Sequence, residues 1–321
     1  GRLAHAIAEF SATHGAALEA DDLAAHRCEW VTPIAVDYLG YQVHEIPPNG
    51  QGIAALIALG LLARLPHLET RPGSAERMHL EIEAMRMAFA DLYAHVGDPE
   101  HMRTDPAMLL DPAYLDRRAR GVELRTAGRY PAGAPAGGGT VYLCTGDAQG
   151  RMVSFIQSNY KGFGSGVVVP GTGIALHNRG MGFVTTPGHP NQVSGGKKPL
   201  HSIIPAFVTR DGAPVMAFGV MGGNMQAQGH VQMMIRHLAE GLHPQACSDA
   251  PRWRIDDAGD LLVESSVAPE VVQGLEAMGH QPHVAAPDSL DFGSAQLALR
   301  LDAASTGTAD AVYAAGSDHR R

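Results

Sequence analysis

Thr140 is the residue whose position most clearly predicts chemistry. It follows the glycine run 137–139 and opens a segment, 140–146, that alternates like a β-strand. If the chain is cut before Thr140, the new α-amine has an ordinary pKa of about 7.7 to 8.0 and can take the proton of its own hydroxyl. Thr140 is therefore a candidate nucleophile, and Gly139/Thr140 a candidate cleavage junction. A plain linker over 131–139, followed by an ordinary strand, is the alternative that this stretch leaves open.

The composition is that of a globular, acidic protein. Of 321 residues, 45% are hydrophobic and 18% are charged, which argues against a disordered chain. The formal charge of −9 argues against nucleic acid or a membrane surface as a partner, and no apolar run is long enough to span a bilayer. Cys28, Cys144 and Cys247 lie too far apart for a disulfide framework or a zinc knuckle, so we expect three buried thiols.

The histidines and glycine-rich loops could suggest a metal or phosphate site, but their spacing does not. The seventeen histidines include His44-Glu45, which runs into Pro47 instead of a helical His-Glu-x-x-His pattern, and the others are scattered. No Lys-Ser/Thr pair follows the loops of 162–173, and no GxGxxG opens a helix. The sequence therefore predicts no metal and no cofactor, and these loops are expected to shape a pocket.

The elements before residue 130 are mainly helical by pattern. The strongest case is 75–95, where apolar residues at helical spacing predict a helix packed on a core. Residues 34–46 alternate as a strand does, and a turn through Gly50 and Gly52 leads into an apolar helix over 53–63. The apolar residues that define the first of these helices are Met78, Ile82, Met85, Met87, Phe89 and Leu92.

After Gly139 the pattern changes to short strands. Segments 140–146 and 151–158 flank a turn and predict a hairpin that carries Thr140. Two sheets packed face to face, with helices on their outer faces, satisfy this order because each sheet must bury one face and cover the other. Further strands are predicted at 202–209, 215–219, 260–264, 294–301 and 309–315, and helices at 226–240 and 269–278.

Several short segments together resemble γ-glutamyltranspeptidases, and their order and spacing match over nearly the whole chain. The resemblance implies an α+β fold, the four-layer αββα sandwich of N-terminal nucleophile hydrolases, made as an inactive precursor that cuts itself. Residues 1–139 would be the C-terminal part of the large subunit and 140–321 the small subunit. The two would stay associated, and a dimer of such heterodimers is compatible with the family. The segments are Gly139-Thr140, 157–160, 162–166, 173–178, 196–202 and 221–223.

The resemblance also implies catalytic roles. In the precursor the Thr140 hydroxyl would attack the carbonyl carbon of Gly139, and in the mature enzyme it would attack a substrate amide to form an acyl-enzyme. Gly222 and Gly223 would supply the backbone N–H groups of an oxyanion hole, where a side chain would obstruct the close approach. Ser158 stands where the family has a threonine whose hydroxyl contacts the nucleophile.

The residues expected to bind substrate depart from the family pattern. Typical members hold the donor α-amine with an acidic residue in Asn-Gln-Met-Asp-Asp-Phe, whereas residues 178–183 read Asn-Arg-Gly-Met-Gly-Phe. Gly182 cannot neutralise an ammonium group, and Arg179 introduces a cation suited to a carboxylate. A small substrate with a carboxylate and an amide but no free α-amine fits this change. An outward surface cation or an internal salt bridge is the alternative role for Arg179.

Four more positions of the substrate site follow from the resemblance. His201 replaces a family serine that helps to bind the donor carboxylate, which leaves Ser202 of that pair. Tyr160 replaces an asparagine that meets the donor, and neighbouring Asn159 is a partial substitute. The family arginine that clamps the donor carboxylate belongs to the N-terminal part of the large subunit, so no residue here is given that role; we expect the chain to be a fragment.

We therefore expect a self-processing amidohydrolase or acyltransferase of the γ-glutamyltranspeptidase-like branch, which includes oxamate amidohydrolases and some acylases. Its partners would be a small γ-glutamyl or oxamate-like amide and water or an amine as acceptor, with no nucleic acid and no membrane. The cytoplasm is the favoured compartment and the periplasm the alternative. An uncleaved, inactive homologue that acts as a binding or assembly module is the competing hypothesis.

Overall fold

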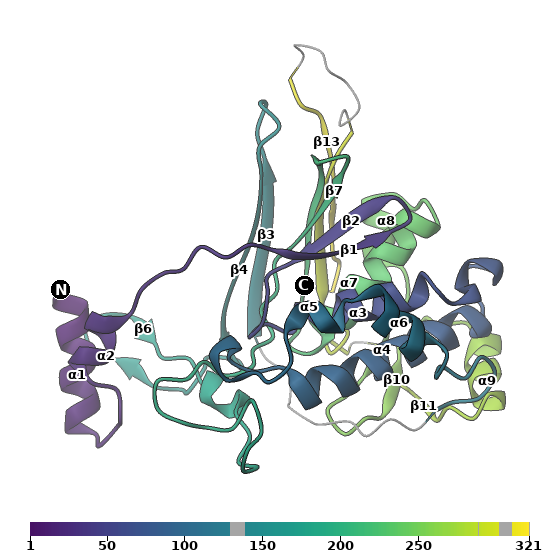
Figure 1. The fold of residues 1–321 in the computed structure, drawn as a ribbon. Helices are drawn as coiled ribbons and strands as arrows, with labels where there is room; N and C mark the ends of the chain where they lie inside the picture. The colour runs from purple at the N-terminus through teal and green to yellow at the C-terminus, as the bar shows by residue number, and fades with distance from the viewer. Residues whose placement is uncertain (129–138, 288, 302–309, 321) are drawn as a thin grey trace.

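A six-stranded antiparallel sheet organises the computed structural model, which describes residues 1–128, 139–287, 289–301 and 310–320. The strand order is β1-β2-β7-β8-β12-β13, so β8 is hydrogen-bonded on both edges (Figure 1). The strands are β1 (Ile34–Tyr38), β2 (Tyr41–Glu45), β7 (Ala206–Arg210), β8 (Ala213–Met221), β12 (Ser294–Arg300) and β13 (Tyr313–Ser317).

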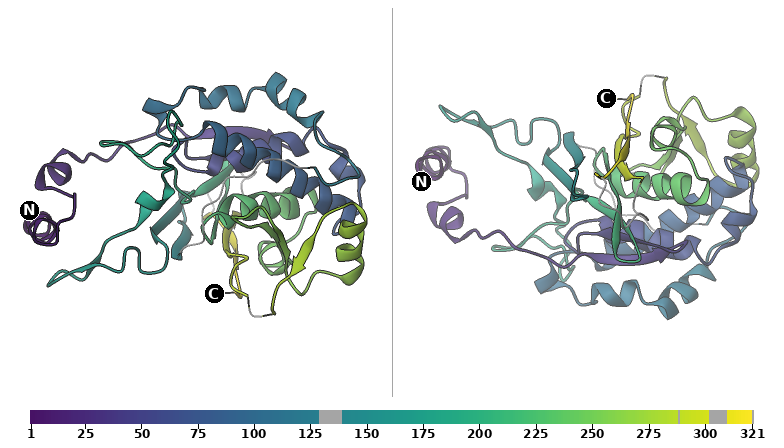
Figure 2. Two further views of the ribbon diagram at one scale, coloured as in Figure 1. Left: turned by 90° about the horizontal axis from the view of Figure 1, so that it is seen from below. Right: turned by 90° about the horizontal axis from the view of Figure 1, so that it is seen from above.

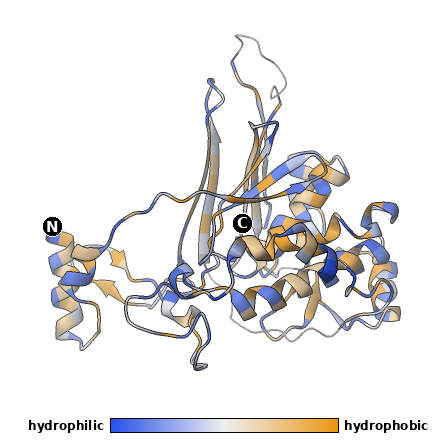
Figure 3. Cartoon of the chain, in the orientation of Figure 1, coloured by the Kyte–Doolittle hydropathy of each residue, from blue (hydrophilic) through white to orange (hydrophobic). Residues whose placement is uncertain are grey.

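Apolar helices cover one face of β8, and a two-stranded ribbon covers the other. Val220 packs against Gly229 of α7 (Met225–Met234), whereas the preceding residue, Gly219, lies against the ring of Tyr142. Successive residues of a strand point to opposite faces, so α7 and Tyr142 lie on opposite sides of the sheet. Helix α3 (Gly52–Leu62), buried along its whole length, contacts α7 and α4 (Ala75–His95) and completes the apolar layer (Figure 3).

The ribbon on the second face consists of β3 (Gly139–Gly146) and β4 (Met152–Tyr160). The two strands pair antiparallel, with a shift of register between Gly139 and Thr140. Tyr142 points inward, and its hydroxyl is 2.8 Å from Ser154 Oγ. The alternate residues Val141, Leu143, Val153 and Phe155 are exposed. The ribbon thus follows the predicted hairpin and buries one face only.

Smaller units surround this body. Helices α1 (Arg2–Thr13) and α2 (Ala20–Ala25) stand clear of the large sheet in all three views (Figures 1 and 2). A second sheet has the order β11-β10-β9. The remaining elements are α5 (Pro106–Leu109), α6 (Pro112–Ala119), β5 (Val168–Val169), β6 (Ile174–Ala175), α8 (Pro244–Asp249), β9 (Trp253–Ile255), β10 (Leu261–Val263), α9 (Pro269–Ala277) and β11 (Pro282–Val284), with short 3₁₀ turns at Pro66–Glu69, Pro99–His101 and Arg179–Gly182.

The predicted helix over 75–95 is confirmed, but two other predicted elements differ. The segment 34–46 forms two strands because Leu39 and Gly40, with φ of 52° and 80°, make a two-residue turn between them. The helix predicted over 226–240 ends as an α-helix at Met234 and continues as a π turn, Ile235–Ala239. The glycines at 137 and 138 lie outside the described residues.

The cysteines and the helix lengths bear on two expectations from composition. Cys247 is buried, but Cys144 is only partly buried and Cys28 is exposed, so the prediction of three buried thiols is wrong. Cys28 follows α2, in a segment away from the core that could have buried it.

Among the helices of the described residues, none is both long and apolar enough to cross a bilayer.

We expect Gly219→Ala to destabilise the fold, because a Cβ at this position would lie 2.5 Å from the Tyr142 ring. Overpacking of this kind costs about 1–3 kcal/mol in the free energy of unfolding. Gly195→Ala is the matched control, because a Cβ there meets nothing within 4 Å. Urea unfolding of both variants tests this contact, and equal stabilities would contradict it.

Candidate active site

Thr140 lies at the start of β3 and is nearly buried, with 6% of its surface exposed. Its partner across the ribbon is Ser158, and Thr140 Oγ1 donates a hydrogen bond of 3.2 Å to Ser158 Oγ. The backbone N–H of Tyr160 donates to the same oxygen at 2.9 Å. Ser158 therefore fixes the direction of the Thr140 hydroxyl, which is the contact that the sequence predicted for it.

The packing of β3 places Thr140 at the far end of β8. Gly146, at the end of β3, lies against Tyr313, which pairs with Arg300 beyond the Met216 end of the β8–β12 ladder. Tyr142 lies against Gly219, further along β8. The two strands therefore run in opposite directions, and the start of β3 lies towards the end of β8, where the glycine pair follows.

Gly222 and Gly223 form the turn from β8 into α7. Their φ angles are 127° and 63°, in the region that favours glycine. A Cβ on Gly222 would also lie 2.9 Å from the Cα of Gly293. Both carbonyl groups accept bonds from the start of α7, at 3.2 and 3.1 Å, whereas the two N–H groups donate to no partner in the described part of the chain. Backbone N–H groups without an acceptor of their own are the kind of donor that an oxyanion hole uses.

Gln51 joins the glycine pair to the predicted substrate residue Ser202. Its side-chain amide donates to the carbonyl of Gly223 at 2.9 Å and to that of Ser202 at 3.1 Å. The Ser202 side chain is 3% exposed, and its hydroxyl has no hydrogen-bond partner among the described residues. Sequence reasoning missed Gln51, although it lies in the turn before α3 that the glycines Gly50 and Gly52 marked.

Arg179 lies directly beside the Thr140–Ser158 pair. Its Nη2 donates to the carbonyl oxygen of Ser158 at 3.0 Å, and its guanidinium carbon is 5.7 Å from the centre of the Tyr160 ring. Nη1 is buried and has no partner in the described ranges, and no carboxylate there pairs with Arg179. Burial lowers the pKa of Arg179 from its ordinary value. The surface-cation and salt-bridge alternatives do not fit this geometry, which leaves donors for an anion.

His201 lies within electrostatic reach of Arg179. Burial, reinforced by the charge of Arg179, lowers the pKa of His201 to about 4, so its imidazole is neutral near pH 7. Its Nδ1 is buried without a partner among the described residues. The backbone of His201 bonds to Asn49 and Gln51, which holds the imidazole next to the turn before α3.

Tyr160 and Asn159 lie at the end of β4, and only Tyr160 contacts other predicted site residues through its side chain. Tyr160 is 4% exposed and has a positive φ of 79°, a conformation uncommon for a bulky residue. Its ring lies beside Arg179 and its backbone N–H donates to Ser158, so Tyr160 lies next to the Thr140–Ser158 pair. Asn159 bonds through its backbone carbonyl to the N–H of Asn178, and no contact joins its side chain to the other predicted residues.

Asp257 is an acidic residue of this region that sequence reasoning missed. Its Oδ1 accepts a bond of 3.1 Å from the side-chain amide of Asn224, next to the glycine pair. Burial raises the pKa of Asp257, and burial, with a smaller contribution from the charge of Asp257, raises the pKa of Tyr160 and of Tyr93. Asp257 comes from the turn between β9 and β10, and no local motif marks it.

The comparisons with known proteins agree on one family. A model of the gamma-glutamyltranspeptidase family matches residues 1–321. The chain is 35% identical to the glutathione hydrolase-like YwrD proenzyme of Bacillus subtilis over 285 residues, and 33% identical to the oxamate amidohydrolase proenzyme of Klebsiella pneumoniae over 305 residues. These matches cover 87% and 94% of this chain. The cephalosporin acylase from Bacillus halodurans matches in structure over 100% of the chain and 57% of its own, with a TM-score of 0.90 and 43% identity.

The fold and these neighbours define an α+β protein of the N-terminal nucleophile hydrolase class. Within that class, the chain belongs to the γ-glutamyltranspeptidase family, as its quoted segments predicted. It spans 54% and 57% of the length of the two curated relatives.

The pKa of His201 predicts a pH-dependent loss of stability. The pKa of His201 is 6.5 in the unfolded chain and about 4 in the folded protein, so between these pH values the unfolded chain binds a proton that the folded protein does not. The contribution of His201 to stability is therefore fully present above pH 6.5 and is lost as the pH falls towards 4. From pH 7 to pH 5 we expect this histidine to cost about 1–2 kcal/mol. Urea unfolding at both values should give His201→Asn a shallower decline than His283→Asn, an exposed control. Equal slopes would contradict the prediction.

Proposed function

We propose that this chain contains the catalytic part of a self-processing N-terminal-threonine amidohydrolase or acyltransferase. The observation that carries the proposal is the bond from Thr140 to Ser158, at the register shift after Gly139 and towards the glycine-pair end of β8. Residues 1–139 would become the C-terminal part of the large subunit and 140–321 the small subunit. The amide-hydrolysing names of the relatives support this class of reaction.

The proposed processing step uses Thr140 before its amine is free. Thr140 Oγ1 attacks the carbonyl carbon of Gly139, its proton passes to the departing amide nitrogen, and the acyl group shifts from nitrogen to oxygen. This shift frees the α-amine of Thr140 and leaves an ester, which water hydrolyses to the carboxylate of Gly139 and the hydroxyl of Thr140. The Ser158 hydroxyl orients the attacking oxygen, because it accepts the bond from Thr140.

Turnover would use the released amine as the base. The amine takes the hydroxyl proton while Thr140 Oγ1 attacks the substrate amide, and the N–H groups of Gly222 and Gly223 stabilise the oxyanion. The proton passes to the leaving amine, and an acyl-enzyme remains. Water or an acceptor amine then attacks the ester and regenerates Thr140.

Arg179 is the residue that we propose for substrate choice. Its unpartnered Nη1 and the unpartnered hydroxyl of Ser202 are suited to a small carboxylate, with neutral His201 and the Tyr160 ring beside them. An oxamate-like amide fits this set better than a γ-glutamyl donor, because Gly182 provides no acid for an α-amine. The relative named oxamate amidohydrolase supports the same choice.

The four-layer αββα sandwich is part of this proposal. Helices, a six-stranded sheet and the β3–β4 ribbon form three successive layers, and the exposed apolar residues of the ribbon give it a face suited to a further layer. We propose that the cut subunits stay associated, since β3 packs on a sheet whose strands β1 and β2 precede the cut. A dimer of heterodimers is the proposed assembly.

Intact mass of the full-length gene product tests the processing step. Wild type should show a break between Gly139 and Thr140, and Thr140→Ala should remain uncut and inactive because it lacks the hydroxyl. Thr145→Ala, an exposed threonine of the same strand, is the matched control and should be cut. A cut and active Thr140→Ala protein would refute the mechanism, and an uncut wild type would favour a binding or assembly module.

Steady-state kinetics of the full-length protein test the role of Arg179. Arg179→Gln should raise KM for oxamate by about 10–100-fold, because charge-assisted hydrogen bonds are lost. The same variant should change the KM of a neutral amide much less. The ratio of the two changes in KM separates carboxylate binding from the support that Arg179 gives Ser158. Arg210→Gln, an exposed arginine beside Tyr41, is the control. An equal loss on both substrates would contradict the assignment.

A further inference from the structure

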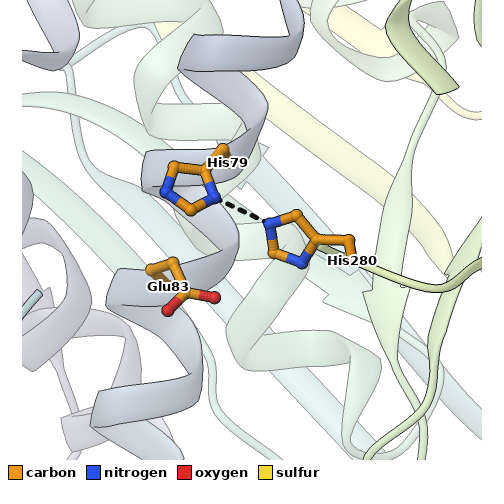
Figure 4. Close-up of side chains that lie close together, drawn as sticks. All are labelled: His79, Glu83 and His280. Carbon is orange, nitrogen blue, oxygen red and sulfur yellow. Dashed lines mark hydrogen bonds between the residues drawn. The ribbon is translucent and has the colours of Figure 1, made fainter. Parts of the chain in front are cut away.

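Three buried side chains from two distant parts of the sequence lie close together. His79 and Glu83 lie one turn apart on the same side of α4, and His280 follows α9 (Figure 4). One ligand atom from each residue lies within 4.8 Å of the other two, and His79 Nδ1 is 2.7 Å from His280 Nε2. His79 and Glu83 have no exposed surface and His280 has 4%.

Backbone geometry fixes the position of His280. The N–H of His280 donates to Leu275 O at 3.0 Å and that of Gly279 to Glu276 O at 2.9 Å, the pair of bonds that ends a helix in a Schellman motif. Gly279 has the positive φ of 87° that this motif requires. Gly274 packs against Ala75 with no room for a side chain, which brings α9 close to α4.

The hydrogen bonds of His79 prepare its Nδ1 to bind a cation. His79 Nε2 lies 2.8 Å from the carbonyl oxygen of Glu123, which can only accept, so the proton is on Nε2 and Nδ1 has a lone pair. A second bond from a ligating imidazole to a carbonyl group is typical of metal-binding histidines. Without an ion, His280 Nε2–H donates to this lone pair, and His280 Nδ1 is buried without a partner in the described part of the chain.

The charge state of the cluster also suits a cation. Burial, with the charges of His79 and Arg86, lowers the pKa of His280 to about 3, and burial lowers that of His79. Both imidazoles are therefore neutral near pH 7, as a metal ligand must be. The fully buried carboxyl group of Glu83 adds an oxygen ligand, which the N–H of Gly128 orients at 2.8 Å.

We propose that His79, Glu83 and His280 form a binding site for a divalent transition-metal ion, with Zn²⁺ the best match. Two imidazole nitrogens and one carboxylate oxygen are a ligand set that zinc accepts, with water in a fourth position. Binding needs His280 in its other tautomer, so its proton exchanges from Nε2 to Nδ1 through water. The two nitrogens must also separate by about 0.6 Å, because zinc–nitrogen bonds of about 2.0–2.1 Å in tetrahedral geometry hold them further apart.

The role of this site would be structural, because its three residues are buried and come from two packed elements. It connects α4 to the end of α9, and its outer bonds, Glu123 to His79 and Gly128 to Glu83, hold the segment that precedes the candidate cleavage junction. The N–H of Ala127 adds a bond of 2.7 Å to Met278 O. The ion would anchor this segment to both helices.

Titration of the tag-free, chelator-treated full-length protein with Co²⁺ and Zn²⁺ tests the site. Wild type should bind one equivalent, with the intense visible bands of four- or five-coordinate Co²⁺, and its unfolding midpoint should rise by several degrees at about a hundredfold excess over Kd. Glu83→Gln keeps an acceptor for Gly128 and should weaken binding about tenfold or more, as should His280→Gln. His283→Gln, an exposed neighbour, should bind like wild type.

Three outcomes would overturn the proposal. One is a wild-type protein without the Co²⁺ bands, which needs no variant to fold. Another is unchanged affinity in both Glu83→Gln and His280→Gln. The last is an equal loss in His283→Gln, which would indicate binding by surface histidines. Circular dichroism of the metal-free variants shows whether a loss of binding reflects the site or the fold.

Discussion

The contact between Tyr142 and Gly219 is the constraint on which the candidate site depends. The Tyr142 ring can lie against β8 at Gly219 because the strand has no Cβ there. With Tyr142 fixed there, the antiparallel course of β3 brings Thr140 towards the glycine turn at the end of β8. On the opposite face of the sheet, His230 Nε2 accepts a hydrogen bond from the N–H of Val220 near the end of β8. His230 is held by a buried contact of 2.6 Å with Glu45. The end of β8 towards which Thr140 lies is thus fixed by packing on one face and by hydrogen bonds from the other.

The resemblance to the family gave candidate site residues that lie on one strand or in one turn. Thr140, Ser158 and the glycine pair could be found because each occupies a fixed place in a short segment, and the fold keeps those places. The hairpin register then brings Thr140 and Ser158 together, as alternation along the two strands required. The same reasoning missed Gln51 and Asp257, whose contacts run to residues far away in the sequence, and no periodicity encodes such pairs.

The cluster of His79, Glu83 and His280 also depends on contacts between residues far apart in the sequence, which local patterns do not predict. His79 and Glu83 are four residues apart on a predicted helix, which is spacing that a metal site can use. Their third member, His280, is placed by a helix end at the other end of the chain, and it reaches α4 because α9 packs on α4, with Gly274 against Ala75. Scattered histidines in a sequence therefore say little against a metal site when the elements that carry them have not yet been placed. The exposure of Cys28 has a similar origin, because composition cannot tell which segments lie outside the core.

The charges around Tyr160 connect the placement of the nucleophile to substrate choice. Burial is the main cause that raises the pKa of Tyr160; Asp257 adds to the rise and Arg179 opposes it. The ring therefore lies within the influence of a cation and an acid that do not pair with each other. Arg179 keeps a buried donor, whereas Asp257 is bonded to Asn224 and burial favours its neutral form. The cation is thus the stronger feature for an incoming ligand, because Arg179 has a buried donor without a partner in the described part of the chain, whereas the Asp257 carboxyl group already accepts a bond. This difference, rather than the loss of one family acid alone, is the physical reason to favour a carboxylate-bearing amide without a free amine.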